Sequence, residues 1–330
     1  MNLQGKRILV TGADGFIGSH LVEHLLQAGA DVTALAQYNS FNFWGWLEEI
    51  PLLPHIQVVT GDIRDGHFCL GLVKNVDVLF HLAALIPIPY SYRAPESYVE
   101  TNIKGTLNLC QAALQGGVQK FIHLSTSEVY GSAKYLPIDE QHPLQAQSPY
   151  SASKIGADAI ATSFYSSFQL PLVIARPFNV YGPRQSARAV IPAIVSQIAA
   201  GATEVKLGNL MTTRDFTFVD DTCRGLLAVA SLDNRFGEVF NIGSNQEISI
   251  GELFRIITGL MGSDAQTECD PERLRPTDSE VQRLRCNGQK LRDANGFQPK
   301  VSLRDGLSRT IDWFQKSGHL QRYKPDLYNV

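Results

Sequence analysis

Short apolar runs alternate with amphipathic stretches along the first half of the chain. Residues 7–11 (RILVT) are rich in β-branched side chains, and residues 19–30 repeat apolar positions at helical spacing. Further apolar runs occupy residues 31–36, 56–60, 77–83, 120–125 and 172–177, and the longest helical stretches are residues 97–115 and 151–168. Strands that are apolar on both faces and alternate with helices are typical of parallel sheets covered on both sides. The pattern therefore predicts an α/β fold with a doubly wound parallel sheet.

The pattern changes at about residue 181. From there on, long apolar runs are fewer, and Arg, Pro and Gly are frequent in residues 182–192, 208–221 and 271–285. Residues 238–244 (EVFNIGS) are an exception, because they have the composition of another buried strand. We expect a first domain at residues 1–180, with a return segment at about 215–250, and a smaller, interleaved α/β domain at residues 181–330.

The turn between the first predicted strand and the first predicted helix contains three glycines at fixed spacing. In GADGFIG (12–18), Gly12, Gly15 and Gly18 follow the pattern G-x-x-G-x-x-G. Such glycines allow a tight turn, close backbone approach to a pyrophosphate and close packing of the helix, whose N-terminal N–H groups face the anion. The motif at this turn predicts a Rossmann domain that binds a dinucleotide.

The sequence leaves the choice between NAD and NADP open. The second strand ends at Ala36 and Gln37, without the acidic residue that usually holds the adenosine ribose of NAD. No arginine favours NADP there either, although residues 38–40 (YNS) could reach a 2′-phosphate. Asp62 follows the third predicted strand, where it could accept a hydrogen bond from the adenine amino group or simply cap a turn.

Two groups of polar residues are candidates for acid–base chemistry. Tyr150 and Lys154 form a Y-x-x-x-K pair, one turn apart on a predicted helix. An unperturbed tyrosine has a pKa of about 10, and we expect the ammonium group and a cationic nicotinamide to lower the pKa of Tyr150. Thr126, Ser127 and Glu128 directly follow the fifth predicted strand, at the end where open α/β sheets bind their ligands. For Glu128 the alternative is a solvated carboxylate at a strand end.

The composition argues against several classes of partner. The 330 residues are 44% hydrophobic, with a formal net charge of −3 and a pI near 6.2, so we expect no surface for nucleic acid or an anionic membrane. No apolar stretch approaches the roughly 20 residues that span a bilayer, and the cytoplasm is the expected location. The five cysteines are scattered, and His20 and His24 lack a third ligand. We therefore predict neither disulfides nor a metal site, and we expect both histidines to face solvent.

The glycine motif, the strand-end residues and the Tyr150–Lys154 pair together resemble the extended short-chain dehydrogenase/reductase family, over essentially the whole chain. Further similar pieces are HLAAL (81–85), TNIKGTLN (101–108), RPFNVYGPRQ (176–185), RDFTFVDD (214–221) and RPTDSEV (275–281). Within that family, the chain is most similar to the nucleotide-sugar 4,6-dehydratases of legionaminic-type acid pathways, through YNSFNFWGWL (38–47), STSEVYG (125–131) and SPYSASKIGADA (148–159). Those enzymes act on nucleotide-activated N-acetylglucosamine.

The resemblance implies conversion of UDP- or GDP-N-acetylglucosamine to a 4-keto-6-deoxy sugar. Tyr150 would take the proton of the 4-hydroxyl group, assisted by Thr126 and Lys154, while the C4 hydride passes to a tightly bound NAD or NADP. Glu128 would then remove the C5 proton, and Glu128 or Ser127 would help to protonate the leaving C6 hydroxyl. Ser127 departs from the Thr-Asp-Glu pattern of the glucose-type dehydratases and matches the Thr-Ser-Glu pattern of the mannose type.

The resemblance also implies which residues hold the two ligands. For the cofactor these are Gly12, Asp14, Gly15, Phe16, Ile17, Gly18, Asp62, Ile63, Leu82, Ala83, Ala84, Tyr150 and Lys154. The second domain would bind the phosphates or the sugar through Asn179, Arg214 and Arg275. The nucleotide base would meet the backbone of Val190.

Three further features are interpreted with the help of the family. Its members usually form homodimers through helices that correspond to residues 97–115 and 151–168, which together make a four-helix interface. The aromatic segment 38–47 is expected to be a loop packed over the cofactor. Asn102 is either a ligand contact or a buried residue that satisfies backbone groups.

Three other functions remain open. A UDP-glucuronate decarboxylase shares the string STSEVYG and the first oxidation, but it tends to carry Arg where this chain has Ile155. A nucleotide-sugar 4-epimerase uses the Thr, the Tyr and the Lys but has no need of a proton-transferring Glu128. A dinucleotide-binding regulatory protein would need no turnover. The intact set of Thr126, Glu128, Tyr150 and Lys154 argues against that last function.

Overall fold

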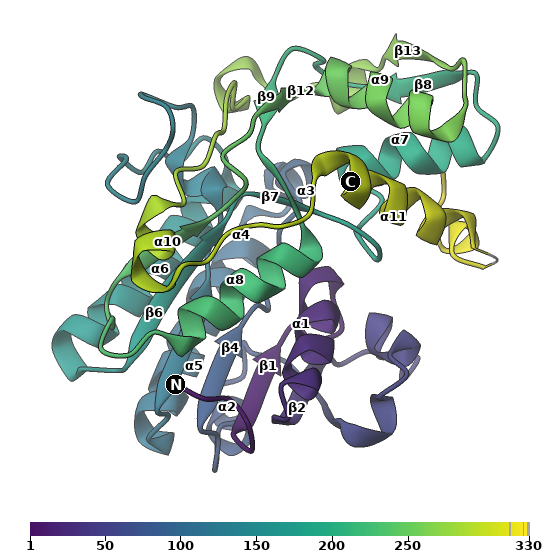
Figure 1. Ribbon diagram of the computed structural model, residues 1–330. Coiled ribbons are helices and arrows are strands. Elements are labelled where there is room, and N and C mark those ends of the chain that lie inside the picture. The colour runs from purple at the N-terminus through teal and green to yellow at the C-terminus, as the bar shows by residue number, and fades with distance from the viewer. Residues whose placement is uncertain (317, 326, 329–330) are drawn as a thin grey trace.

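A seven-stranded, fully parallel sheet forms the centre of the molecule (Figure 1). The computed structural model describes all residues except 317, 326, 329 and 330. The strands of the sheet are β1 (Arg7–Thr11), β2 (Asp31–Gln37), β3 (Gln57–Gly61), β4 (Val78–His81), β5 (Lys120–Leu124), β6 (Leu172–Pro177) and β11 (Val239–Ile242). Their order in space is β11-β6-β5-β4-β1-β2-β3, so the topological switch point lies between β1 and β4. The prediction of a doubly wound parallel sheet is confirmed.

Helices cover both faces of this sheet (Figure 1). One face carries α1 (Phe16–Gln27) and α8 (Val219–Ser231), and the other carries α2 (Gly66–Leu72), α5 (Gly105–Gly116) and α6 (Pro149–Phe168). Alternate residues of β1 serve the two faces, because successive side chains of a strand point to opposite sides. Val10 packs in one core with Leu21 and Leu226, and Leu9 packs in the other with Leu109. Burial on both faces explains why the strands are continuous apolar runs.

Short helices join the strands at the edge where a ligand is expected. They are η1 (Gly45–Glu49), η2 (Leu53–His55), α3 (Ile88–Arg93), α4 (Pro95–Tyr98), the π-helical turn η3 (Val99–Lys104) and η4 (Ser127–Tyr130). The π-helical turn leads directly into α5, so the helix that was expected at residues 97–115 is divided into three elements.

The remaining elements form the upper part of Figure 1 and the connections to it. They are β7 (Asn179–Tyr181), α7 (Val190–Ala199), β8 (Glu204–Leu207), β9 (Thr213–Arg214), β10 (Phe216–Phe218), β12 (Ile248–Ser249), α9 (Ile250–Met261), β13 (Gln266–Cys269), η5 (Pro271–Arg273), η6 (Thr277–Ser279), α10 (Gln289–Asn295), α11 (Leu303–Gln315) and η7 (Leu320–Arg322). Three small sheets pair β10 with β7, β12 with β9 and β13 with β8. Because β11 returns to pair with β6, the chain leaves the large sheet and re-enters it.

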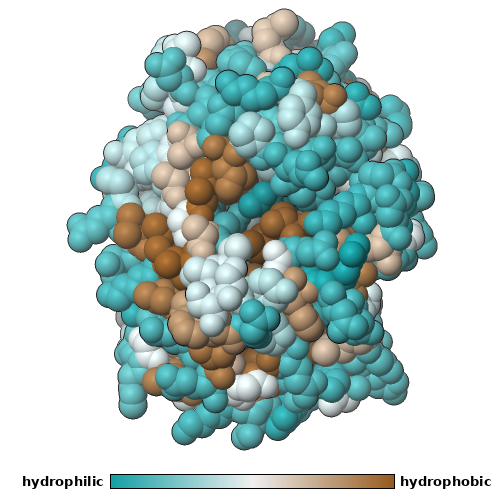
Figure 2. Space-filling view, turned by 90° about the vertical axis from the view of Figure 1, so that its left-hand side faces the viewer, coloured by the Kyte–Doolittle hydropathy of each residue, from teal (hydrophilic) through white to brown (hydrophobic). Residues whose placement is uncertain are grey.

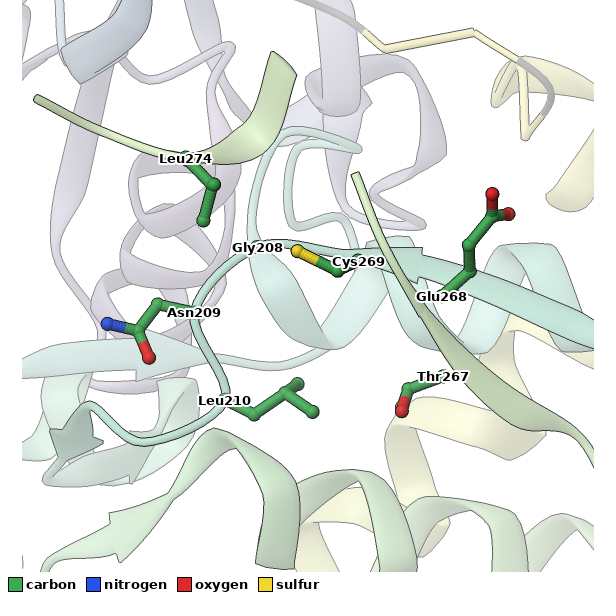
Figure 3. Close-up of a pocket in the computed structure, with 7 residues that line it drawn as sticks. All are labelled: Gly208, Asn209, Leu210, Thr267, Glu268, Cys269 and Leu274. Carbon is green, nitrogen blue, oxygen red and sulfur yellow. The ribbon is translucent and has the colours of Figure 1, made fainter. Parts of the chain in front are cut away.

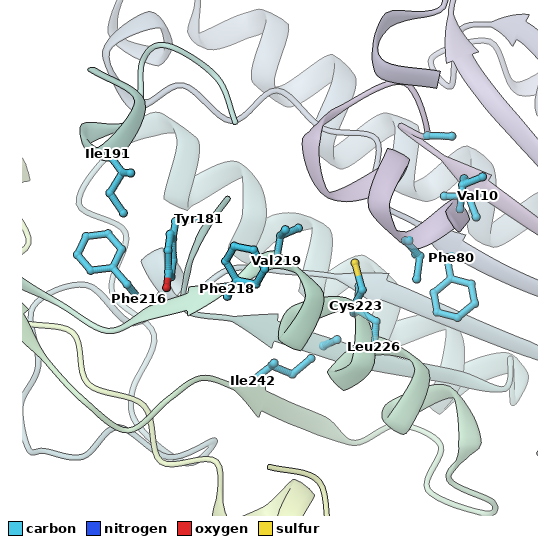
Figure 4. Close-up of a cluster of buried hydrophobic side chains, with 14 of the residues drawn as sticks. Val10, Phe80, Tyr181, Ile191, Phe216, Phe218, Val219, Cys223, Leu226 and Ile242 are labelled. Carbon is cyan, nitrogen blue, oxygen red and sulfur yellow. The ribbon is translucent and has the colours of Figure 1, made fainter. Parts of the chain in front are cut away.

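One apolar core joins the large sheet to this upper part (Figure 4). Val10 and Phe80 lie on the sheet, and Leu226 of α8 packs in the same cluster as Tyr181 and Phe216 of the small sheet. The five residues are at most 8% exposed. The helix α8 therefore belongs to both parts of the molecule.

The two histidines of α1 do not face solvent, so that expectation was wrong. The His20 side chain is 12% exposed, its Nε2 atom lies 3.1 Å from the carbonyl oxygen of Pro183, and burial lowers its pKa to about 4. The Nε2 atom of His24 lies 3.7 Å from a carboxylate oxygen of Asp220. Both residues therefore contact segments that lie far along the chain. No helix within the described ranges is long and apolar enough to cross a bilayer.

Candidate active site

The glycine loop between β1 and α1 has the geometry of an anion cradle. Gly12 has φ of +67°, and a Cβ atom on it would lie 2.8 Å from the backbone nitrogen of Ala83. A Cβ atom on Gly18 would overlap the carbonyl oxygen of Gly12. The helix α1 begins after Gly15 with no side-chain cap and no acidic residue in its first turn. Its first N–H groups therefore remain available to an anion such as a pyrophosphate, so the loop fits the predicted dinucleotide.

The aromatic segment 38–47 packs on the glycine loop. The N–H group of Trp46 donates to the carbonyl oxygen of Asp14 at 3.0 Å, and the Asp14 carboxylate accepts the N–H of Gln37 at 3.1 Å. Burial raises the pKa of Asp14. Asn39 bonds within the segment, where its amide nitrogen donates to the carbonyl oxygens of Gln37 and Phe43 at 3.2 and 2.7 Å. The segment thus covers the position where the adenosine half of a dinucleotide was expected.

Asp62 is engaged by its own turn. Its carboxylate accepts the backbone N–H of Arg64 at 2.9 Å and two hydrogen bonds from the Arg64 guanidinium at 2.9 and 2.5 Å. The hydrogen bonds from Arg64 lower the pKa of Asp62. The turn-capping alternative therefore describes the contacts of Asp62, and its role toward adenine stays a prediction. Ile63 is buried next to it and accepts a hydrogen bond from Asn108 through its carbonyl oxygen.

The segment after β4 meets the glycine loop from the other side. The N–H groups of Leu82 and Ala83 both donate to the Thr11 hydroxyl at 3.2 Å. Ala84 follows directly and is partly buried. Asn102 then fixes the next residue, Leu85, by accepting its N–H at 2.8 Å and donating to its carbonyl oxygen at 2.9 Å. Of the two alternatives for Asn102, the buried residue that satisfies backbone groups is the one observed.

The strand-end residues and the tyrosine meet at the top of β5. Thr126 caps η4 by accepting the N–H of Glu128 at 3.2 Å, and Ser127 is 2% exposed. Tyr150 lies in the first turn of α6, behind the capping box formed by Ser148 and Ser151. The first residues of η4 and α6 thus place Glu128 and Tyr150 at the same edge of the sheet.

Tyr150 sits in an apolar pocket that changes its acidity. Its side chain packs with Ile88 and Tyr98, and the two tyrosine rings meet edge to face with centroids 6.2 Å apart. Burial raises the pKa of Tyr150, the carboxylate of Glu128 raises it further, and the Thr126 hydroxyl opposes the change. In the chain on its own the pKa of Tyr150 is thus raised, and the lowered pKa that was expected with a cationic nicotinamide beside the ring stays a prediction. These influences also mean that Thr126, Glu128 and Tyr150 lie within interaction range of one another.

Lys154 is held one turn further along α6. Its ammonium group is buried and donates to the carbonyl oxygen of Leu124, the last residue of β5, at 2.8 Å. Burial lowers the pKa of Lys154 to about 8. The ammonium group is therefore held at the end of β5.

Two of the expected substrate residues meet across a carboxylate. Arg214 is 6% exposed and donates to Glu280 at 3.3 Å, and Arg275 lies 3.8 Å from the same oxygen. Burial lowers the pKa of Arg214, and the carboxylate of Glu128 opposes that change. Glu128 therefore lies within electrostatic range of both Arg214 and Tyr150. Sequence reasoning missed Glu280, although it lies in the string that contains Arg275.

Asn179 and Val190 have less specific surroundings. The side-chain oxygen of Asn179 is buried and has no hydrogen-bond partner within the described chain. Val190 is the first residue of α7, and its side chain packs against the large core. Only the backbone of Val190 is thus left for a ligand.

Two surface pockets lie outside this group of residues. One, of about 380 Å³, lies between β8 and β13 and is lined by Gly208, Asn209, Leu210, Thr267, Glu268, Cys269 and Leu274 (Figure 3). It borders the arginine pair, because Leu274 directly precedes Arg275. The other, of about 610 Å³, lies at the opposite edge of the sheet, beside the start of β1 and β2. Neither includes Tyr150 or Lys154.

Sequence reasoning also missed a polar cluster behind Lys154. Asp158 lies four residues after Lys154 and is buried with His123 and Arg176. Its spacing from Lys154 was the available signal, because residues four apart share a helix face. The partners on β5 and β6 could be found only in three dimensions.

Comparison with known proteins reveals related sequences over nearly the whole chain. The profile of the GDP-mannose 4,6 dehydratase family matches residues 9–310. The dTDP-glucose 4,6-dehydratase of Streptomyces antibioticus is 34% identical over 312 residues, which cover 93% of this chain and 92% of that protein.

Solved structures extend the comparison to the fold. The dTDP-glucose 4,6-dehydratase of Streptomyces venezuelae, solved with NAD bound, has a TM-score of 0.84 at 34% identity, covering 94% of this chain and 97% of that chain. The UDP-glucuronic acid 4-epimerase of Bacillus cereus, solved with UDP-glucuronic acid and NAD, has a TM-score of 0.87 at 30% identity, covering 96% of this chain and 100% of that chain. The similar proteins thus include both dehydratases and epimerases.

Proposed function

Because the chain belongs to the GDP-mannose 4,6-dehydratase family, within the extended short-chain dehydrogenases/reductases, we propose that it is a nucleotide-sugar 4,6-dehydratase, a hydro-lyase. The observation that carries the proposal is the position of Glu128. Its carboxylate influences the pKa values of both Tyr150 and Arg214, so it lies within electrostatic range of a phenol and of a guanidinium group that we propose to bind phosphate. A hexose attached to a diphosphate would bring its ring to the phenol and the carboxylate, and its phosphates to the guanidinium group.

We propose NAD, or NADP, as the cofactor, supported by the NAD in the related dehydratase and epimerase structures. The glycine loop would hold its pyrophosphate at Gly12, Gly15 and Gly18 and at the N-terminus of α1. The segment 38–47 and the residues Leu82–Ala84 would enclose it. When bound, the cofactor accepts a hydride from the sugar and later returns it.

The first task of the chain is to take a proton from the sugar 4-hydroxyl group. Tyr150 is the proposed base, with Thr126 hydrogen-bonding the same oxygen. Since the apolar pocket and Glu128 both raise the pKa of Tyr150, the phenolate is unfavourable in the chain alone. A positive charge above the ring would favour the phenolate and so couple proton removal to the binding of an oxidised cofactor.

The second task is to eliminate water between C5 and C6. The 4-ketone acidifies the C5 proton, which Glu128 would remove. Ser127 has no useful acidity near neutral pH, so Glu128 or a water molecule would protonate the leaving 6-hydroxyl group. Reprotonation at C5 after hydride return to C6 would give the 4-keto-6-deoxy sugar, and the cofactor would be regenerated.

We propose UDP- or GDP-N-acetylglucosamine as the substrate, on the basis of the similarity in segments 38–47, 125–131 and 148–159. Arg214 and Arg275 would hold the diphosphate, because guanidinium groups match phosphate oxygens in charge and geometry. Glu280 keeps the two guanidinium groups beside each other. Asn179, with its unpartnered oxygen, and the backbone of Val190 would complete the contacts.

A 4-epimerase is the second candidate, favoured by the similarity to the Bacillus cereus enzyme. Epimerisation needs only the oxidation and a return of hydride to the other face of C4. It would leave Glu128 without a proton-transfer role.

Mass spectrometry of the products tests the proposal directly. The purified protein is incubated in parallel with UDP-N-acetylglucosamine, GDP-N-acetylglucosamine, dTDP-glucose and UDP-glucuronate. We expect loss of one water from an N-acetylglucosamine nucleotide. Loss of water only from dTDP-glucose would overturn the proposed substrate, loss of carbon dioxide would indicate a decarboxylase, and a product of unchanged mass but new stereochemistry would indicate an epimerase.

We also propose a homodimer through α5 and α6. Val99, Leu114 and Phe168 are 49%, 38% and 56% exposed, and α6 carries the exposed small residues Ala152 and Ala159. Apolar side chains are visible on the face that carries α6 (Figure 2). Exposed apolar side chains on neighbouring helices support association with a second copy.

A further inference from the structure

A buried carboxylate lies directly behind the candidate active site. Asp158 follows Lys154 by one helical turn on α6 and is 3% exposed. It accepts hydrogen bonds from Ser125 at 2.7 Å, from His123 at 3.2 Å and from Arg176 at 2.9 Å. A buried charge is tolerated only when it is paired and hydrogen-bonded. Asp158 meets that condition with partners from β5 and β6.

The two histidines near this carboxylate are neutral. His123 must carry its proton on Nε2, because the Asp158 carboxylate can only accept. Its Nδ1 atom is buried without a partner in the described part of the chain. His81 is bonded between the hydroxyls of Thr11 at 2.9 Å and Thr106 at 3.0 Å. Burial lowers the pKa of both histidines, so neither adds a charge at neutral pH.

The remaining charges around Lys154 are one anion and one cation. The groups that interact with it are Asp158 on α6, His81 on β4 and His123 on β5, with Arg176 on β6 beyond Asp158. Arg176 is fixed at its far end, where it donates to the hydroxyl of Tyr130 at 3.1 Å. That hydroxyl donates in turn to Asn241 on β11 at 2.8 Å. The negative charge of Asp158 therefore interacts with two cations, Lys154 and Arg176, and each of these is held in place by a further hydrogen bond.

We propose that Asp158 is a positioning residue that keeps Lys154 in its ammonium form, and that Arg176 limits how strongly it does so. Within the described part of the chain, the hydrogen bond of the Lys154 ammonium group goes to the carbonyl oxygen of Leu124, and this neutral acceptor cannot by itself hold a charge in an apolar site. Asp158 supplies the missing negative charge without contacting the ligand side of the helix. The inference depends on the proposed function only for its effect on turnover.

Titration of Lys154 in the full chain tests this role. Lysine labelled with ¹³C at the ε-carbon is followed by NMR, and its signal is assigned with Lys154→Arg. A second displaced signal is expected from Lys120, whose pKa burial also lowers. For the native chain we expect a midpoint near 8. In Asp158→Asn the midpoint should fall by a pH unit or more, about a tenfold larger acid dissociation constant.

A second variant should move the midpoint in the opposite direction. In Arg176→Gln the carboxylate acts on Lys154 without a competing cation, so the midpoint should rise. Ser125→Ala is the matched control, because it removes a hydrogen bond from Asp158 but keeps the charge, and its midpoint should equal the native one. If Asp158→Asn does not fold, Arg176→Gln decides alone.

Several outcomes would overturn the inference. They are an unchanged midpoint in folded Asp158→Asn, a shift of equal sign in both charge variants, and an Arg176→Gln midpoint that is unchanged or lower. A purely structural role would lower the melting temperature and leave the midpoint in place. The pH dependence of kcat/KM should agree, with its alkaline limb at lower pH in Asp158→Asn. Lack of turnover with every nucleotide sugar would contradict the proposed function and leave the NMR result valid.

Discussion

Glu128 links the chemistry of the site to the recognition of its ligand. Thr126 caps η4 through the N–H of Glu128, so the carboxylate begins from a fixed backbone. From there it influences Tyr150 on α6 and Arg214 on β9, which belong to different parts of the fold. An anion at this point opposes phenolate formation, and we infer that the site is built for proton transfer at C5 as well as at the 4-hydroxyl group.

Replacement of Glu128 should separate oxidation from elimination. In Glu128→Gln the base for the C5 proton is lost, but Thr126, Tyr150 and Lys154 remain. We expect C4 oxidation to persist, seen as transient absorbance of reduced nicotinamide, and dehydration to slow by about 10²–10⁴-fold. Ser127→Ala is the control and should retain dehydration if Glu128 alone transfers the proton. Full dehydration by Glu128→Gln would remove Glu128 from its proposed role.

At the scale of elements, the start of α6 determines where Tyr150 lies. Ser148 accepts the N–H of Ser151 at 3.0 Å, and the Ser151 hydroxyl accepts the N–H of Ser148 at 3.0 Å. This reciprocal capping box spans the phenol, because Ser148 lies two residues before Tyr150 and Ser151 directly after it. The first turn of α6 is therefore held by its own side chains, independently of the contacts that Tyr150 makes.

Loss of this cap should affect catalysis more than stability. We expect Ser148→Ala to lower the free energy of unfolding by about 1 kcal/mol, measured by urea denaturation. Because the first turn frays, kcat should fall about tenfold or more through misplacement of Tyr150. Ser302→Ala, which removes the cap of α11, should cost similar stability and leave kcat unchanged. Equal kcat values for the two variants would contradict this link.

The sequence predicted the large sheet well because its central strands, such as β4, β5 and β6, are buried on both faces. That burial requires continuous apolar runs, which are visible without any structure. The sequence also predicted that residues 125–128 (STSE) lie at the end of a strand, because the apolar run before them ends there. The acidity of Tyr150 could not be predicted this way. It depends on Ile88 and Tyr98, whose segment folds over the ring from the other side of β4.

At the scale of the whole molecule, the remaining misjudged residues are those whose partners are distant in sequence. His20 and His24, which were expected to face solvent, contact Pro183 and Asp220. Periodicity describes a residue's own element and says nothing of which other segment covers it. The return segment expected at about 215–250 contains α8 and β11, which lie against the large sheet, and the domain limits at residues 180 and 181 stay a prediction.

The proposed dimer can be tested with one substitution. Ala159 is exposed on α6, and Ala159→Arg would place a charge in the proposed four-helix interface. We expect its mass by light scattering to fall from twice the chain mass to the chain mass of 36.4 kDa. Gln315→Arg, at the exposed end of α11, should stay dimeric. A native protein that is already monomeric would refute the interface.

The apolar core that passes through α8 limits how this protein can admit its ligands (Figure 4). A hinge rotation of the upper part would separate apolar side chains of this cluster and expose them to water. That exposure costs about 25 cal/mol for each Å² of apolar surface. Ligand exchange should therefore depend on peripheral segments, such as the one that carries Phe41, which is 89% exposed. The rate of product release would then be limited by the opening of a loop, while the large sheet and α8 keep their positions.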